Sequence, residues 1–242
     1  MNLKKLSVAL AAAAALGTSH AAVVNVAGVS WDTADFFNFT SASTLLENVV
    51  TTAGGELSGF GRITSINGNA GFCAGCELTY TFSGYLLDAA YLPNPAFSFS
   101  GGTFQFFVSA ANSSFATGAG FGDGTPWLTL SGANSSGGTT GSLVGNITNF
   151  AELAGQGNGY LNVSGGLAAA YFDTNTKAGG ADFFFTSEFQ PIPNGSVVNG
   201  KTHIGNATIS GSSQTVPEPG VLALLGLGLA GLSFSRRNKK PA

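Results

Sequence analysis

Hydrophobic and polar residues alternate along much of the chain, which is the pattern of β-strands that bury one face. The clearest alternation runs from Glu77 to Ser83, where Leu78, Tyr80 and Phe82 share one face and polar side chains occupy the other. We therefore predict a strand here. Further strands are predicted at 23–29, 57–66, 97–99, 103–108, 127–130, 143–147, 160–163, 167–172, 182–189 and 202–209.

One segment has a different period. Residues 41–50 carry apolar side chains at helical spacing, at Ala42, Leu45, Leu46, Val49 and Val50. A short helix that begins near Thr40 or Ser41 is predicted here, because Ser and Thr are favoured helix caps.

Turn residues separate the predicted strands. Asn67-Gly68-Asn69 and Gly101-Gly102 are typical of tight turns between strands. Many short strands with such turns predict an all-β fold, and we expect a β-sandwich or jelly-roll-like domain with at most one or two short helices. The chain has no strict internal repeat, so a solenoid is not expected.

The first residues have the features of a secretory signal peptide. Lys4 and Lys5 precede an apolar run over 6–17, and Ser19 and Ala21 provide small residues at the −3 and −1 positions of a cleavage site. We predict a signal helix that is cleaved after Ala21. An uncleaved membrane anchor is the alternative, but the apolar run is too short to cross a bilayer.

The last residues contain a second apolar stretch, from Gly220 to Ser235, which has no charge. A cluster of basic residues follows it, namely Arg236, Arg237, Lys239 and Lys240. We predict a slightly short transmembrane helix whose basic end stays in the cytoplasm. An ordinary tail anchor, with Pro217 and Pro219 as a stiff spacer, is the alternative.

The motif Val216-Pro217-Glu218-Pro219, the Gly/Leu-rich stretch and the basic end together resemble the PEP-CTERM sorting signal. The resemblance implies export by the Sec machinery and processing near the motif by an exosortase, a membrane cysteine peptidase. It also implies a Gram-negative bacterium that makes exopolysaccharide. The protein would be held briefly in the inner membrane by its tail and would then reach the cell surface or extracellular matrix.

These features divide the chain into a signal peptide (1–21), a β-rich secreted domain (22–209), a linker (210–215) and the sorting signal (216–242). Without the two signals, Arg62, Lys177 and Lys201 are the remaining basic residues, and the net charge falls from −3 to about −8. Such a charge argues against nucleic acid, whose phosphates require basic groups. It is compatible with divalent cations or neutral polysaccharide.

Cys73 and Cys76 form the only cysteine pair. A C-x-x-C motif occurs in redox sites, zinc sites and local disulfides. Zinc is unsupported, because His203 is the one histidine left after the signal peptide. We predict a disulfide, since an exported protein meets an oxidising compartment. If a disulfide stabilises the fold by lowering the entropy of the unfolded chain, so small a loop adds about 2 kcal/mol to the free energy of unfolding.

Oxygen ligands for calcium are available around Asp173, Asn175 and Asp182, and at Asp32 with Asp35. Lys177 departs from the EF-hand pattern, and these residue types are common in turns. Turn chemistry is therefore the preferred interpretation, and no metal or other cofactor is expected.

Candidates for catalysis are few. His203 lies near no nucleophile motif of the G-x-S-x-G type, so a Ser-His-Asp triad is not indicated. Two carboxylates could serve glycoside hydrolysis, but the sequence places no pair together among Glu47, Glu56, Glu77, Glu152 and Glu188.

Aromatic residues offer stacking surfaces for sugars. Trp31, Trp127 and Tyr160 are the better candidates for such contacts, whereas alternation assigns Phe104 and Phe106 to a core, and we expect the same for Phe107.

Taken together, these features predict a non-enzymatic exported protein of the cell surface or matrix, associated with the exopolysaccharide of a biofilm or floc. A secreted polysaccharide hydrolase and a calcium-stabilised adhesion module are the alternatives.

Overall fold

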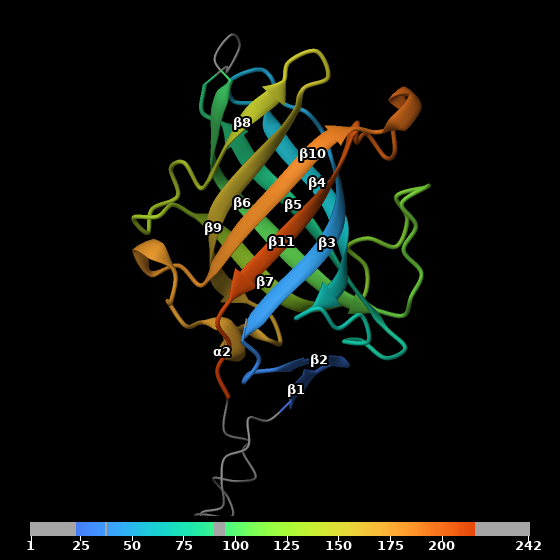
Figure 1. Cartoon of the computed structure of the whole chain (residues 1–242), viewed down its shortest axis with the longest axis vertical. Coiled ribbons are helices and arrows are strands. Elements are labelled where there is room, and N and C mark those ends of the chain that lie inside the picture. The colour runs from blue at the N-terminus through green and yellow to red at the C-terminus, as the bar shows by residue number, and fades with distance from the viewer. Residues whose placement is uncertain (1–22, 37, 90–94, 216–242) are drawn as a thin grey trace, which may run out of the picture.

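The computed structural model describes residues 23–36, 38–89 and 95–215. These residues form an eight-strand antiparallel closed β-barrel with a single short α-helix (Figure 1). Nine strands fill the eight positions of the wall, because two of them share one position. They are β3 (Phe39–Glu47), β4 (Glu56–Ile66), β5 (Glu77–Leu87), β6 (Ala96–Ser109), β7 (Thr125–Ala133), β8 (Leu143–Asn149), β9 (Ala154–Gly165), β10 (Phe183–Pro191) and β11 (His203–Gly211).

Pairing between β9 and β10 closes the sheet on itself, from Phe183 opposite Leu161 to Phe189 opposite Gly155. The all-β prediction is confirmed, but the expected β-sandwich differs from the structure, which has one curled sheet in place of two packed layers. Sandwiches and barrels both bury alternate residues of each strand. The local pattern therefore does not distinguish them.

β7 and β8 share one position in the wall, between β6 and β9. One half of β6 pairs with β7 and the other half with β8, and both strands pair with β9. β7 ends with Ala133 opposite Tyr160, and β8 starts with Leu143 opposite Gly159. The two strands thus form one line that is interrupted by an excursion at 134–142.

Aromatic rings in the barrel lie opposite glycines of neighbouring strands. A Cβ atom added to Gly59 would lie 2.3 Å from Cζ of Phe82, and one added to Gly61 would lie 2.4 Å from Cζ of Tyr80. The same relationship recurs around the wall, in the pairs Gly145–Phe97, Gly155–Phe189 and Gly211–Phe183. This pairing explains why a chain with 36 glycines and 20 phenylalanines forms a packed interior.

One end of the barrel is covered by a hairpin of β1 (Val23–Val26) and β2 (Val29–Asp32) and by helix α2 (Ala169–Phe172), seen at the bottom of Figure 1. Ala27 and Gly28 both have positive φ, as a two-residue turn of type I′ requires. Trp31 in this hairpin stacks on Phe172 with ring centroids 5.0 Å apart. We call this the closed end.

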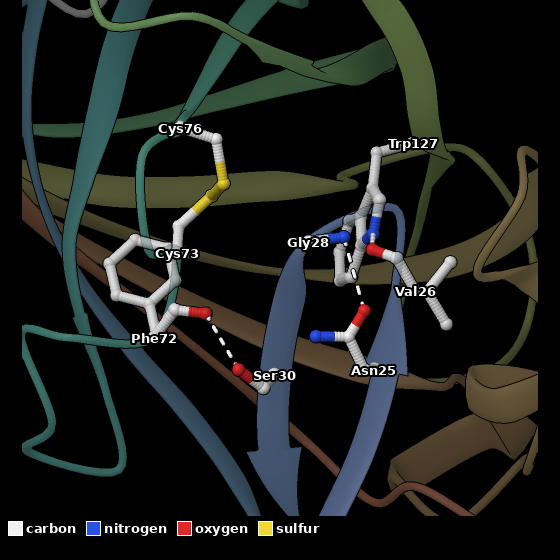
Figure 2. The surroundings of a disulfide bond; sticks show 8 residues. All are labelled: Asn25, Val26, Gly28, Ser30, Phe72, Cys73, Cys76 and Trp127. Carbon is white, nitrogen blue, oxygen red and sulfur yellow. Dashed lines mark hydrogen bonds between the residues drawn. A yellow bond between two sulfur atoms is a disulfide. The ribbon is translucent and has the colours of Figure 1, made fainter.

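A disulfide joins Cys73 and Cys76, as predicted, and β5 begins at the next residue. Figure 2 shows the tip of the β1–β2 hairpin beside it: a Cβ atom on Gly28 would lie 3.2 Å from Sγ of Cys76. The Ser30 hydroxyl donates to the carbonyl oxygen of Phe72 at 3.0 Å (Figure 2). The disulfide loop therefore supports the hairpin as well as the start of β5.

The helix predicted at 41–50 is wrong, because 39–47 form strand β3. The inward positions of β3 include Ser41, Ser43 and Glu47, which are buried although they are polar. The Ser43 hydroxyl lies 2.9 Å from the Tyr80 hydroxyl and donates to the carbonyl of Ala207. Because such partners satisfy buried hydroxyl groups, polar residues can occupy core positions of β3. The inward positions of this strand are therefore not uniformly apolar, and the alternation that marks a strand is missing from its sequence.

The strand predicted at 167–172 is also wrong, because its second half forms α2. Leu167 is exposed, whereas Ala168 and Phe172, four positions apart, are fully buried. Four-residue spacing on one buried face is helical. The single strand predicted at 23–29 is wrong, because β1 and β2 are separated by the turn at Ala27 and Gly28. The turn predicted at Gly101-Gly102 is also wrong, because β6 runs through it and unites the strands predicted at 97–99 and 103–108. The remaining predicted strands are confirmed, within their observed bounds.

The segment predicted as a linker, 210–215, differs in part from that expectation. β11 continues to Gly211, and the Ser213 side chain is buried at the closed end. The predicted signal helix (1–21) and the sorting signal with its transmembrane helix (216–242) lie outside the described residues. Within the described part of the chain, no helix has the length and apolar character needed to cross a membrane.

Candidate functional site

A shallow groove of about 660 Å³ runs over the outer face of β9, β10 and β11, and a second depression of about 300 Å³ adjoins it. We call the two together the outer groove. Its polar lining comes from alternate, outward-facing positions of the three strands, chiefly Gln156, Asn158, Thr186, Glu188, Asn206 and Thr208.

Strand register assembles these side chains into rows across the barrel wall. Glu188 lies opposite Gln156 on one side and Asn206 on the other. One step along β10, Thr186 lies between Asn158 and Thr208 in the same way. Directly opposite residues on one face of a sheet are close neighbours, so each row presents several polar groups at one level.

Four polar side chains of the groove are not used by the fold. In the described residues, the side chains of Gln156, Asn158, Glu188 and Asn206 make no hydrogen bond to the protein, and three of them are exposed. Other polar groups of the barrel are engaged; the Ser142 hydroxyl, for example, donates to carbonyl oxygens of β6. The groove therefore offers free amide donors and acceptors to a bound molecule.

An aromatic pair flanks the same face. Tyr160 on β9 lies opposite Phe184 on β10, their ring centroids are 5.1 Å apart, and both side chains are half-buried. Tyr160, one of the predicted stacking residues, is thus accessible beside the groove. Aromatic rings with one open face can pack against the apolar face of a sugar ring.

The two predicted tryptophans do not reach this surface. Trp31 and Trp127 are buried at the closed end, where their ring centroids lie 5.9 Å apart. The Trp127 indole N–H donates a hydrogen bond to the carbonyl oxygen of Val26. Figure 2 shows these two residues side by side. Both residues hold the hairpin against the barrel. Phe104 and Phe106 are in the core, as alternation predicts. The expectation for Phe107 is wrong, because its side chain is half-buried and lies outside the core cluster.

Glu77, one of the carboxylate candidates, holds the loop that follows β6. Its carboxylate accepts hydrogen bonds from the backbone of Asn112 and Ser113 and from the Ser113 hydroxyl, and it lies 3.6 Å from Arg62. Burial alone would raise the pKa of Glu77, but these hydrogen bonds and Arg62 outweigh burial and lower the pKa.

The remaining glutamates are dispersed. Glu56 accepts a hydrogen bond from the backbone of Gly84, and Glu152 accepts one from the side chain of Asn149. Glu47 lies inside the other end of the barrel. Of the five, Glu188 is the one in the lining of the outer groove, so the groove contains a single carboxylate.

His203 is tied to neighbouring residues. Its Nδ1 lies 3.0 Å from the Thr202 hydroxyl, and its Nε2 lies 3.1 Å from the carbonyl oxygen of Glu152. Partial burial lowers the pKa of His203, although the hydrogen bond with Glu152 opposes that effect. Both ring nitrogens are therefore engaged in the fold.

Asp182, a calcium candidate, is used by the backbone. Its carboxylate accepts hydrogen bonds from the N–H groups of Val163, Thr174 and Asn175. Asp32 likewise accepts the N–H of Ala34. Across the described ranges, no three His, Cys, Asp or Glu side chains come together to hold a metal. The observed contacts are those of turn stabilisation.

The rows of the groove could not be read from the sequence. Gln156, Glu188 and Asn206 come from three strands, and only the pairing of those strands makes them neighbours. Their one local signal is an outward polar position in each strand, and many positions share it.

Comparison with known proteins places residues 215–237 in the family described as the PEP-CTERM protein-sorting motif. This match confirms the resemblance based on Pro217-Glu218-Pro219 and the segment that follows. It implies export with a C-terminal sorting signal and processing by an exosortase. No curated protein and no solved structure matches the chain.

Proposed function

We propose that this chain, an exported protein with a PEP-CTERM sorting motif, is a non-enzymatic component of the cell surface or extracellular matrix that binds exopolysaccharide through its outer groove. Sorting by an exosortase would bring the barrel to the place where such a polymer accumulates. The domain would then attach to the polymer along its outer face.

The observation that carries the proposal is the row Gln156–Glu188–Asn206, whose side chains have no partner in the described fold. Amides and carboxylates of this kind form hydrogen bonds with sugar hydroxyls, and each amide supplies both donors and acceptors. The Tyr160–Phe184 pair adds a surface for a sugar face at the edge of the groove.

The charge of the groove favours a neutral polymer. Glu188 is the one charged side chain in the groove lining, and the lining holds no basic residue. With both signals removed, the domain would carry about −8 overall, which repels an anionic polysaccharide. We therefore propose a neutral polysaccharide, or one with amino groups.

The single carboxylate of the groove supports a binding role. Glycoside hydrolysis usually needs two carboxyl groups on either side of the scissile bond. Within the described lining, Glu188 is flanked by amides and hydroxyls.

The proposal is tested by affinity electrophoresis of the mature protein in gels that contain the producer's own exopolysaccharide. We expect the polymer to slow the native protein, and a Gln156→Ala/Glu188→Ala/Asn206→Ala variant to lose most of that retardation. A Ser83→Ala/Gln105→Ala variant is the matched control, because both side chains are exposed on a different face of the barrel.

Equal retardation of the groove variant and the control variant would overturn the assignment of the groove. Release of reducing sugars from the polymer by the native protein would overturn the non-enzymatic role.

A further inference from the structure

The barrel end opposite the hairpin contains a cavity of about 40 Å³, which we call the mouth cavity. Apolar side chains make up most of its wall, including Leu57, Phe97, Phe99, Leu143, Ile147 and Phe189. A cavity needs about 10–15 Å³ of open space to hold one water molecule. The mouth cavity therefore has room for a small chemical group.

Glu47 is the exception among these apolar residues. It ends β3 and lines the mouth cavity, and only 7% of its surface is exposed. Among the described residues its carboxyl group has no hydrogen-bond partner and no ion pair. Its oxygens keep some accessible surface, since they are not among the fully buried polar atoms that lack a partner. A carboxyl group so largely removed from water among apolar side chains is unfavourable, so its position in this wall calls for a reason.

Lys201 is the nearest basic residue, but it is directed to another partner. Its ammonium group donates to the Ser58 hydroxyl at 2.7 Å and forms no ion pair with Glu47. Burial raises the pKa of Glu47 to about 8, and Lys201 only partly opposes that effect. Burial therefore favours the protonated form of the Glu47 carboxyl group toward neutral pH.

The wall of the mouth cavity selects against metal ions. Calcium takes six to eight oxygen ligands, and magnesium also requires a shell of oxygens. Here Glu47 is joined mainly by aromatic and aliphatic groups, with Ser187 as a nearby hydroxyl. Aromatic rings attract organic cations through their faces, and a carboxylate supplies the opposite charge.

We propose that the mouth cavity binds a small organic ammonium ion, with its nitrogen against the Glu47 carboxylate and its apolar part among Phe97, Phe99 and Phe189. The mouth cavity and the outer groove adjoin across the barrel wall, where Gly157, Ser187 and Phe189 line both. Ammonium binding at Glu47 does not depend on polysaccharide binding in the groove.

Ammonium binding at this site is coupled to proton release. An ammonium ion pairs with the ionised form of Glu47, whereas the empty site is protonated below about pH 8. The affinity for an ammonium ion therefore rises with pH, by up to tenfold per unit, until Glu47 is ionised without ligand.

Other titratable groups lie around Glu47 on the adjoining elements. His203 is the first residue of β11, and Lys201 lies two residues before it. Tyr80 lies on β5, and Glu56 lies near Lys201. His203 is the register partner of Glu47, but its ring contacts Thr202 and Glu152. Glu56 does not line the mouth cavity, so a Glu56→Gln variant removes a nearby charge and leaves the carboxyl group of the cavity in place.

The test is a calorimetric titration of the native protein with butylammonium chloride, and with butanol as its neutral isostere, at pH 6, 7 and 8. We expect butylammonium affinity to increase nearly tenfold from pH 6 to 7 and about fivefold from pH 7 to 8. Close to one proton should be released at pH 6, measured in buffers of different ionisation enthalpy. Butanol should bind weakly and without dependence on pH.

Substitution then assigns the effect to one residue. We expect Glu47→Gln to lose butylammonium binding and to retain butanol binding, which also shows that the cavity is intact. Glu56→Gln should keep both. Absence of butylammonium binding at pH 8, or equal binding by Glu47→Gln and the native protein, would overturn the proposal.

Discussion

The indole Nε1–H of Trp31 donates a hydrogen bond to the Ser213 hydroxyl at 2.9 Å, although 182 positions separate them in the sequence. The same hydroxyl donates to the side-chain oxygen of Asn38 at 2.7 Å. Ser213 is thus both acceptor and donor in a buried cluster. This cluster joins the N-terminal hairpin to the segment after the last strand.

Ser213→Ala leaves the Trp31 indole without its acceptor in a buried place. We expect the free energy of unfolding to fall by about 1–3 kcal/mol, measured by urea denaturation. Ser136→Ala is the matched control, because the Ser136 side chain is exposed and only its backbone forms a hydrogen bond. Equal stability of the two variants would show that the cluster contributes nothing.

A Cys73→Ala/Cys76→Ala variant removes the loop that lies against the hairpin tip. The expected loss of stability is about 2 kcal/mol, since the closed loop is very short. Because Ser30 bonds to Phe72 beside the disulfide, amide hydrogen exchange should increase at Val29 and Ser30. Unchanged exchange at these two residues would limit the role of the disulfide to the start of β5.

Gly61→Ala should overpack the barrel. The new methyl group would lie 2.4 Å from Cζ of Tyr80 and 2.6 Å from a backbone oxygen, and neither atom is on a flexible side chain. We expect a loss of about 1–3 kcal/mol in thermal or urea unfolding. Gly165→Ala is the control, because no atom lies within 4 Å of its added methyl group. A stable Gly61→Ala variant would refute the pairing of rings with glycines.

Glu77 makes stability depend on pH in the acid range. Its pKa in the folded protein is lowered, so its contribution is complete above its unfolded pKa of about 4.5 and is lost as pH falls through the folded value. Glu77→Gln should therefore destabilise the protein at pH 7 and have a smaller effect at pH 3. Urea unfolding at the two pH values measures this, and an equal loss at both would contradict it.

Glu47 makes stability depend on pH in the opposite direction. Its folded pKa is about 8 and lies above the unfolded value, so folding takes up a proton between these values. Stability should fall as pH rises from about 4.5 to 8, by up to about 1.4 kcal/mol per unit. Glu47→Gln should abolish this slope. A slope that survives the substitution would assign the effect to another group.

The alternation of side chains was sufficient to predict most strands, because a strand with an apolar inner face is visible in one segment alone. It failed for β3, where Ser41, Ser43 and Glu47 face inward. The partners that satisfy the two serines come from strands that are distant in the sequence. Ser41 donates to the carbonyl oxygen of Ile209, and Ser43 bonds to Tyr80 and Ala207.

The closure of the barrel and the outer groove were not predictable for the same reason. Both depend on which strands pair and in which register, and that information is spread over the whole chain. The disulfide was predictable because its two cysteines are three residues apart.

The last described residues of the chain are held at the closed end of the barrel by hydrogen bonds. Gln214 is fastened to α2 through its backbone N–H on the carbonyl of Tyr171 and its side chain on Ala170, and the match to the sorting motif starts at the next residue. A protein that binds the motif would therefore approach the barrel from its closed end. The mouth cavity and most of the outer groove lie toward the opposite end of the barrel.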